Sequence, residues 1–207
     1  MRPLRSNDGM TLVELVVAMS MLSVVLLIFT SVLASVQRSV VVNQRYSEAN
    51  DEARLALQQL DRELRSGNVI NDPADAITGF TDAPANQRLL IYTQANLPTR
   101  GEAQCELWKV TADAKLQVRR WTPGSSSWAT SWRTVAEYII NRSTGVNAFT
   151  MNTDPLKGER TVDVRLQVNP DPVANPDRTI ELQASLTGRN TSYNYPTNIC
   201  QTLPSGA

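Results

Sequence analysis

The stretch of sequence that decides the fold is Met10–Val36, which reads MTLVELVVAMSMLSVVLLIFTSVLASV. Glu14 is its one charged residue, and no charge follows from Leu15 to Val36. As a helix, this uncharged run is about 33 Å long, enough to cross a bilayer core of roughly 30 Å. Core helices of soluble proteins rarely stay so uniformly apolar over this length. The sequence therefore predicts a membrane-inserted helix over residues 10–36.

The helix is expected to continue beyond the membrane as an amphipathic segment, residues 37–66. No Gly or Pro occurs between Met10 and Ser66, and Gly67 and Pro73 then supply the stop. Past residue 45 the apolar residues follow helical spacings of three and four and form one stripe: Tyr46, Ala49, Ala53, Leu57, Leu60 and Leu64. We expect residues 53–64 of this stripe to pack on the domain that follows.

Residues 67–207 change character to short alternating segments separated by Gly, Pro, Asn and Asp. The clearest strands are Thr161–Val168 and Thr179–Leu186, where apolar and polar residues alternate with a period of two. A proline-rich loop, residues 169–176, separates them, which favours an antiparallel hairpin. Weaker strand candidates are Arg88–Gln94, Glu106–Ala112, Leu116–Trp121 and Thr134–Ile140. The predicted fold class is α+β, a long N-terminal α-helix packed on an antiparallel β-sheet head.

Composition excludes several kinds of chemistry. The 207 residues contain 20 Lys plus Arg, 20 Asp plus Glu and no His, so the formal net charge is zero. Catalytic triads and zinc sites that use histidine are therefore excluded, and two cysteines cannot form a four-thiolate zinc site. The loop residues Asn71, Asp72, Asp75, Asp82, Asp171, Asn175 and Asp177 do not have the spacing of an EF-hand calcium loop. We expect no metal, no cofactor and no enzyme.

The residues at the start of the apolar helix, Gly9-Met10-Thr11-Leu12-Val13-Glu14-Leu15, form a recognisable motif. They resemble the class III signal of type IV prepilins and type II secretion pseudopilins. The resemblance implies that residues 1–9 are a leader, that a prepilin peptidase cleaves between Gly9 and Met10, and that Met10 is then N-methylated. It also implies that Glu14 helps to dock the subunit into a growing filament.

The same resemblance implies partners and a location. The chain would span the bacterial inner membrane once, with a short cytoplasmic leader and an extracytoplasmic head, and would contact lipid before entering a pilus or pseudopilus. Its partners would be the peptidase, other pilin subunits and the inner-membrane assembly platform. We expect nucleic acid as a partner only in a DNA-uptake role.

The head is similar in its order to J-type pseudopilins and PilW-like minor pilins. The segments that carry this similarity are residues 57–64, 106–110 and 188–190. Met10 stands where Phe is commonest in the family, and Ser31 stands where major pilins often have a helix-kinking Pro. These departures favour a minor member.

Four alternatives to this interpretation stay open. Thr11 and Glu14 have the spacing of a capping box, in which Glu14 only satisfies backbone donors, and Glu14 could also lie in the lipid headgroup layer. The N-terminus could instead be an ordinary signal peptide cleaved after Ala34. The chain could instead be a single-pass anchored module that binds DNA or carbohydrate outside any filament.

Two features of the head give further candidates. Cys105 and Cys200 would lie in an oxidising compartment, which favours a disulfide over two buried thiols. A run of cations and aromatics could bind nucleic acid or sugar at the surface, or could be a hairpin whose tryptophans cover the sheet while its arginines stay solvated. Its members are Arg119, Arg120, Trp121, Trp128, Trp132 and Arg133.

Overall fold

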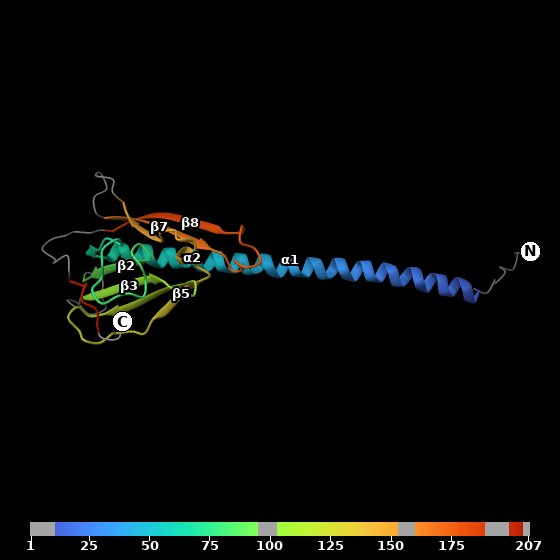
Figure 1. Cartoon of the computed structure of the whole chain (residues 1–207), viewed down its shortest axis with the longest axis horizontal. Coiled ribbons are helices and arrows are strands. Elements are labelled where there is room, and N and C mark those ends of the chain that lie inside the picture. The colour runs from blue at the N-terminus through green and yellow to red at the C-terminus, as the bar shows by residue number, and fades with distance from the viewer. Residues whose placement is uncertain (1–10, 95–102, 153–159, 189–198, 205–207) are drawn as a thin grey trace, which may run out of the picture. The chain divides into compact units, whose positions relative to one another are not determined.

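The computed structural model describes residues 11–94, 103–152, 160–188 and 199–204 (Figure 1). The chain divides into two units, residues 1–45 and residues 46–207. Helix α1 (Leu12–Ser66) runs through both, so the predicted long helix is confirmed. Gly67 follows its last residue, and a Cβ atom at Gly67 would lie 2.9 Å from Cγ2 of Ile91. This close approach explains why a glycine stands there.

The second unit contains two antiparallel sheets, so the predicted α+β class, a long helix packed on an antiparallel β head, is confirmed. The larger sheet has the order β1 (Val69–Ile70), β2 (Arg88–Thr93), β3 (Gln104–Val110), β4 (Lys115–Trp121) and β5 (Arg133–Glu137). The smaller sheet has the order β6 (Phe149–Met151), β7 (Thr161–Val168) and β8 (Ile180–Thr187), and a short helix, α2 (Asn141–Thr144), precedes it.

The division into two sheets has a local cause at the end of β5. The predicted strand Thr134–Ile140 stops early, because Tyr138 adopts a positive φ of 62° that a strand cannot continue through. One isolated bridge, between Ile139 and Val168, then connects the two sheets. Strands β1 and β6 and helix α2 were missed in the sequence, since each is only two to four residues long.

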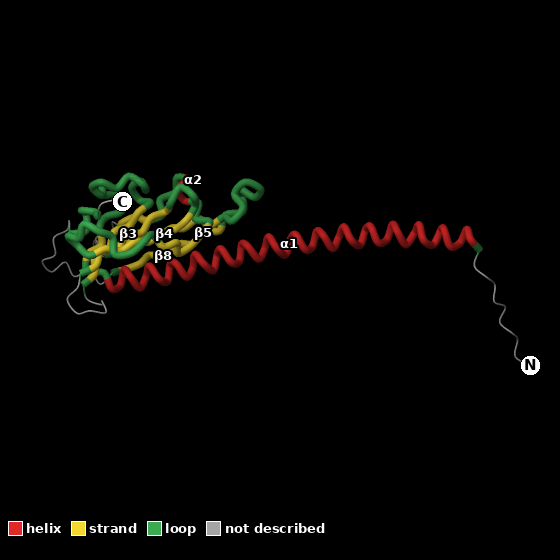
Figure 2. The backbone as a smooth tube through the Cα atoms, turned by 90° about the horizontal axis from the view of Figure 1, so that it is seen from below, coloured by secondary structure: helices red, strands yellow, loops and turns green. Residues whose placement is uncertain are grey.

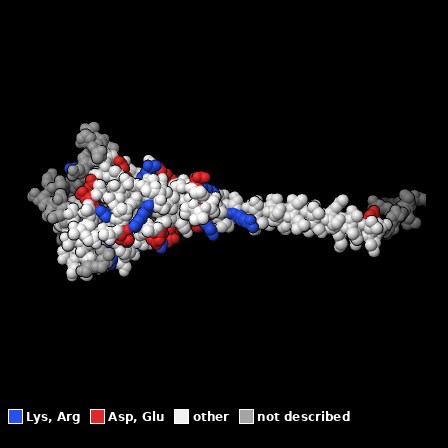
Figure 3. All heavy atoms as spheres, viewed as in Figure 1, with Lys and Arg blue, Asp and Glu red and all other residues white. Residues whose placement is uncertain are grey.

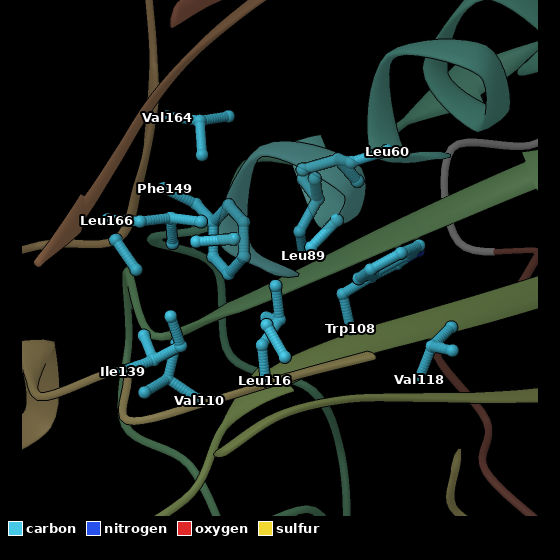
Figure 4. Close-up of a cluster of buried hydrophobic side chains, with 14 of the residues drawn as sticks. Leu60, Leu89, Trp108, Val110, Leu116, Val118, Ile139, Phe149, Val164 and Leu166 are labelled. Carbon is cyan, nitrogen blue, oxygen red and sulfur yellow. The ribbon is translucent and has the colours of Figure 1, made fainter. Parts of the chain in front are cut away.

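The main core lies between residues 46–66 of α1 and both sheets (Figure 2). Five of the six predicted stripe residues are buried, Leu57 is partly buried, and Ala56 joins them. Leu60 lies in one buried cluster with Leu89 and Trp108 from the larger sheet and Val164 from the smaller one (Figure 4). The three alanines, Ala49, Ala53 and Ala56, are fully buried, and small side chains let the helix lie close to the strands.

A second core covers the opposite face of the larger sheet. Trp121, Leu107 and Leu90 point into it, and Phe80 covers them from the loop between β1 and β2. The predicted disulfide is confirmed: Cys105 on β3 is bonded to Cys200, with their Cα atoms 5.7 Å apart. The bond fixes the segment 199–204 against this core.

The predicted hairpin of β7 and β8 is also confirmed. All eight residues of β7 pair with β8 without a break in register. The connecting loop is held by its own side chains, since Asn169 Oδ1 accepts a hydrogen bond from the backbone N–H of Asp171, and Asn169 Nδ2 donates to the carbonyl of Asn175.

Candidate functional site

The N-terminal turn of α1 holds the first candidate site. The backbone N–H and the hydroxyl of Thr11 each donate a 3.1 Å hydrogen bond to Oε2 of Glu14. In return, Thr11 Oγ1 accepts a hydrogen bond of 3.3 Å from the backbone N–H of Glu14. This is the reciprocal geometry of a capping box. The predicted cleavage and methylation residues, Gly9 and Met10, lie outside the described residues.

The helix surface that follows is apolar and uncovered. The large apolar side chains from Leu12 to Val41 are exposed, and none of the described residues in the first unit is buried. Figure 3 shows most of this stretch of α1 as white, uncharged surface, with charged groups only at its two ends. The most apolar window of α1 has a mean hydropathy of 2.7, and α1 is the one helix among the described residues long and apolar enough to cross a membrane. Such a surface needs lipid or other helices around it.

Four hydroxyl groups of the uncharged run that follows Glu14 are satisfied by the helix itself. The hydroxyl groups donate to backbone carbonyls three or four residues earlier, at 2.8–2.9 Å: Ser20 to Val17, Ser23 to Met19, Thr30 to Leu26 and Ser31 to Ile28. Hydroxyl groups paired in this way can enter an apolar environment without losing a hydrogen bond. Glu14 is therefore the group that an apolar environment would penalise most.

The aromatic residues of the cation and aromatic cluster lie at different depths in the head, so the cluster is not a flat surface patch. Trp121 is fully buried and lies beneath the surface, whereas Trp128 and Trp132 are half-buried above it. The guanidinium of Arg119 lies 3.9 Å from the ring centre of Trp128, and Lys109 Nζ lies 3.7 Å from that of Trp132. One face of each outer tryptophan is thus covered by the chain's own cation.

Arg120 turns to the other face of the same sheet. Its guanidinium forms ion pairs with Glu106 of β3 and with Glu63 of α1, the latter at 3.1 Å. Trp108 Nε1 donates a 3.0 Å hydrogen bond to the second oxygen of Glu106. Burial raises the pKa of Glu106, and the negative charge of Glu63 adds to this, which outweighs the opposite effects of Arg120 and Trp108. The network therefore connects the end of α1 to two strands.

Arg133 is exposed and does not join these contacts. Sequence reasoning missed Lys109 and Phe80, which both lie within 6.4 Å of the Trp132 ring centre. Lys109 also pairs with Asp82. The strand register brings these residues together: Lys109 lies opposite Gln117, two residues from Arg119. Successive side chains of β3 point to opposite faces of the sheet, so Lys109 lies on the face opposite to that of Trp108. This alternation is the only signal in the sequence that could have placed Lys109 on the same face as the cluster.

The acidic loops are held by local hydrogen bonds. Asp72 accepts a hydrogen bond from the backbone N–H of Ala74, and Asp171 accepts from that of Ala174. Such side-chain-to-backbone bonds are typical of turns. In the part of the chain that the structure describes, no three His, Cys, Asp or Glu side chains come together as a metal site would require.

Comparison with known families identifies the N-terminal segment. Residues 4–30 match the family model of the prokaryotic N-terminal methylation motif. The matched range includes Gly9, Met10 and Glu14 and most of the apolar run. No curated protein and no solved structure matches the chain. The match supports the type IV pilin and pseudopilin family, whose members are substrates of prepilin peptidase, and it says nothing about the head.

Proposed function

We propose that this chain, which carries the N-terminal motif of type IV pilins and pseudopilins, is a minor structural subunit of a type IV pilus, of a type II secretion pseudopilus or of the tip complex of either. The observation that carries the proposal is the overlap of two features. The methylation motif covers residues 4–30, and the helix that begins within it at Leu12 exposes a continuous apolar surface.

The N-terminus supplies the assembly chemistry. Removal of the leader, residues 1–9, makes Met10 the first residue. Its new α-amino group is positively charged, and the peptidase then methylates it. Both hydrogen bonds from Thr11 end on Oε2 of Glu14, and no described residue donates to Oε1. Capping and docking can therefore act together, with Oε2 holding Thr11 and Oε1 accepting the amine of a neighbouring subunit. That pairing offsets the cost of placing a carboxylate among apolar helices.

The apolar helix has two successive environments in this proposal. Before assembly it anchors the chain in the bacterial inner membrane, with the leader in the cytoplasm and residues 67–207 on the other side. After extraction it packs against the helices of other subunits on the inner-membrane platform, and the head is displayed outside. The amphipathic part, residues 37–66, connects the two regions. The chain acts by assembly and not by catalysis.

The alternative is an anchored module that binds DNA or carbohydrate. It would need accessible aromatic faces, and Arg119 and Lys109 cover one face of Trp128 and of Trp132. Trp121 lies beneath them, fully buried. These contacts favour a stabilising role for the cluster. Salt-sensitive DNA binding by the purified chain that is lost on replacing Arg119 and Arg120 would support the alternative instead.

The mass and N-terminal sequence of the mature protein from its host test the proposed function. We expect an N-methylated Met10 as the first residue. A Gly9→Leu variant should retain residues 1–9 and serves as the processing control. A mature terminus at Ser35 would identify an ordinary signal peptide, and an unprocessed terminus in a host with an active prepilin peptidase would also contradict the proposal.

A further inference from the structure

The outer edge of β8 is the longest regular free strand edge in the described part of the chain. The other three sheet edges are short or irregular: β1 has two residues, β6 has three, and the pairing of β5 shifts register at Leu116 and Gln117. Strand β8 has eight residues, pairs with β7 along its whole length and contains neither Lys nor Pro. Proteins usually interrupt or charge such an edge because it can pair with another chain.

The direction of the backbone groups in β8 follows from its partner strand. Thr161, Arg165 and Gln167 of β7 form backbone hydrogen bonds on the side away from β8, with Asn152, Ala148 and Ile140. The intervening residues of β7 must therefore bond to β8, where they lie opposite Ile180, Leu182, Ala184 and Leu186. The backbone N–H and C=O groups of Glu181, Gln183, Ser185 and Thr187 consequently point to the free edge.

The core-facing side chains of β8 are incompletely covered. On β7 the corresponding row is buried, with Val162, Leu166 and Val168 fully so. On β8, Ile180, Leu182 and Ala184 stay half-buried although they pack against the same core. The difference arises because no further strand of the described chain covers them. An additional strand on this edge would bury apolar surface and pair the outward-pointing N–H and C=O groups of these four residues at the same time.

The solvent-facing side chains of β8 carry little charge that could repel an added strand. Glu181 is its one charged residue, and Arg165 of β7 forms an ion pair with it at 2.7 Å. Hydrogen bonds from Arg165 and then Gln183 lower the pKa of Glu181 to about 2, so the pair is fully ionised at neutral pH. The neighbouring outward side chains, Gln183, Ser185 and Thr187, are uncharged. This edge therefore lacks the charges that usually prevent strand addition.

We propose that the free edge of β8 is a docking site for an extended strand from the head of a neighbouring filament subunit. The strand is amphipathic: its apolar residues continue the half-buried row of Ile180, Leu182 and Ala184, and its polar residues lie beside Gln183 and Ser185. Only an extended segment satisfies a row of backbone donors and acceptors spaced two residues apart, which identifies the occupant as a strand. The inference rests on the proposed function, because a filament brings other heads beside this one.

Amide hydrogen exchange tests the proposal at single residues, with the full-length chain in detergent compared with the chain in filaments from its host. In detergent, the amides of Gln183, Ser185 and Thr187 should exchange rapidly, while those of Leu182 and Ala184 are already protected by β7. In filaments, the three outward amides should exchange at least ~100-fold more slowly. The alternation distinguishes strand addition from simple coverage of the surface.

A matched pair of variants makes the test causal. Gln183→Pro removes the outward N–H without removing a hydrogen bond to β7, and Gln183→Thr removes the same side chain but keeps the N–H. We expect Gln183→Pro to lower incorporation into filaments at least ~5-fold and Gln183→Thr to leave it unchanged. If Gln183→Pro does not fold, Gln183→Lys at the same site replaces it, since an edge lysine opposes strand addition but retains the backbone.

The outcomes separate this proposal from the proposed function. A chain that is processed at Met10 and incorporated, but whose outward amides exchange equally fast in detergent and in filaments, would overturn the docking edge and leave the subunit role intact. Equal incorporation of Gln183→Pro and Gln183→Thr would do the same. An unprocessed chain that never enters filaments would remove the subunit role and the docking edge with it.

Discussion

The hydroxyl of Tyr46 donates a 3.0 Å hydrogen bond to Oδ1 of Asn169, a residue 123 positions later in the chain. Tyr46 is the first residue of the second unit, and Asn169 begins the loop between β7 and β8. The guanidinium of Arg178, at the other end of this loop, lies 4.2 Å from the ring centre of Tyr46. Both ends of the loop therefore hold α1 at the point where the helix joins the second unit.

Tyr46→Phe should destabilise the second unit. The change removes the hydroxyl and leaves the buried Oδ1 of Asn169 with one donor fewer, so we expect the free energy of unfolding to fall by about 1–2 kcal/mol. Denaturant unfolding of the full-length chain in detergent, followed by tryptophan fluorescence, measures this change. The matched control is Tyr138→Phe, because Tyr138 is 42% exposed. Equal stability of the two variants would show that the Tyr46 hydrogen bond contributes nothing.

Glu106 should give the second unit a characteristic pH dependence. Its pKa is raised above the ordinary value of 4.5 by burial and by Glu63, so between these two pKa values the native state binds more protons than the unfolded state. The free energy of unfolding that Glu106 contributes is therefore fully present below pH 4.5 and is lost as the pH rises through the raised pKa.

The Glu106→Gln variant isolates this contribution. The amide oxygen can still accept the hydrogen bond from Trp108, but the side chain no longer titrates. We expect the difference in unfolding free energy, wild type minus variant, to decrease with rising pH by about 1.4 kcal/mol for each unit by which the pKa is raised. Denaturant unfolding at closely spaced pH values measures it. A difference that increases with pH would mean that Arg120, and not burial, dominates the titration.

The disulfide should contribute strongly to stability. Cys105 and Cys200 are 95 residues apart, and a cross-link over that distance stabilises by up to about 4.6 kcal/mol in the chain-entropy model. We expect the double variant Cys105→Ala, Cys200→Ala to unfold at a lower denaturant concentration than the oxidised chain and at nearly the same concentration as the reduced chain. An intact-mass increase of two hydrogens on reduction establishes the bond itself. Unchanged mass on reduction would contradict it.

The sequence predicted the elements whose periodicity is long. The Gly- and Pro-free run gives α1 almost to the residue, and the alternation around Val164 and Leu182 gives β7 and β8 with their pairing. Strands as short as β1 and β6 carry no periodicity of their own, so the division into two sheets depended on the conformation of Tyr138. Local sequence also cannot reveal which face of a sheet packs against α1, and this hid the pairing of Arg120 with Glu63.

The candidate site was predictable to a similar degree. The capping geometry of Thr11 and Glu14 follows from their spacing alone. The aromatic cluster was recognised by composition, but its arrangement was not, because β-strand register decides that Trp121 points into the core and that Lys109 approaches Trp132. Motifs within one turn of a helix can be recognised from sequence, whereas clusters that form across neighbouring strands can be recognised only when the strand register is known.

Three variants at the start of α1 should separate the two roles of Glu14. Glu14→Gln keeps a side-chain oxygen that can cap Thr11 but removes the charge, Glu14→Ala removes both, and Thr11→Val removes the hydroxyl but keeps the carboxylate. If the charge pairs with the Met10 amine of a neighbour, Glu14→Gln and Glu14→Ala are both processed normally, yet both enter filaments at least ~10-fold less than wild type, since 1.4 kcal/mol is tenfold in an equilibrium. Thr11→Val stays close to wild type.

The mass of the processed chain and its amount in sheared filaments are the two measurements. Should Glu14→Gln assemble as well as wild type while Glu14→Ala does not, the carboxylate acts as a helix cap and the docking role is wrong.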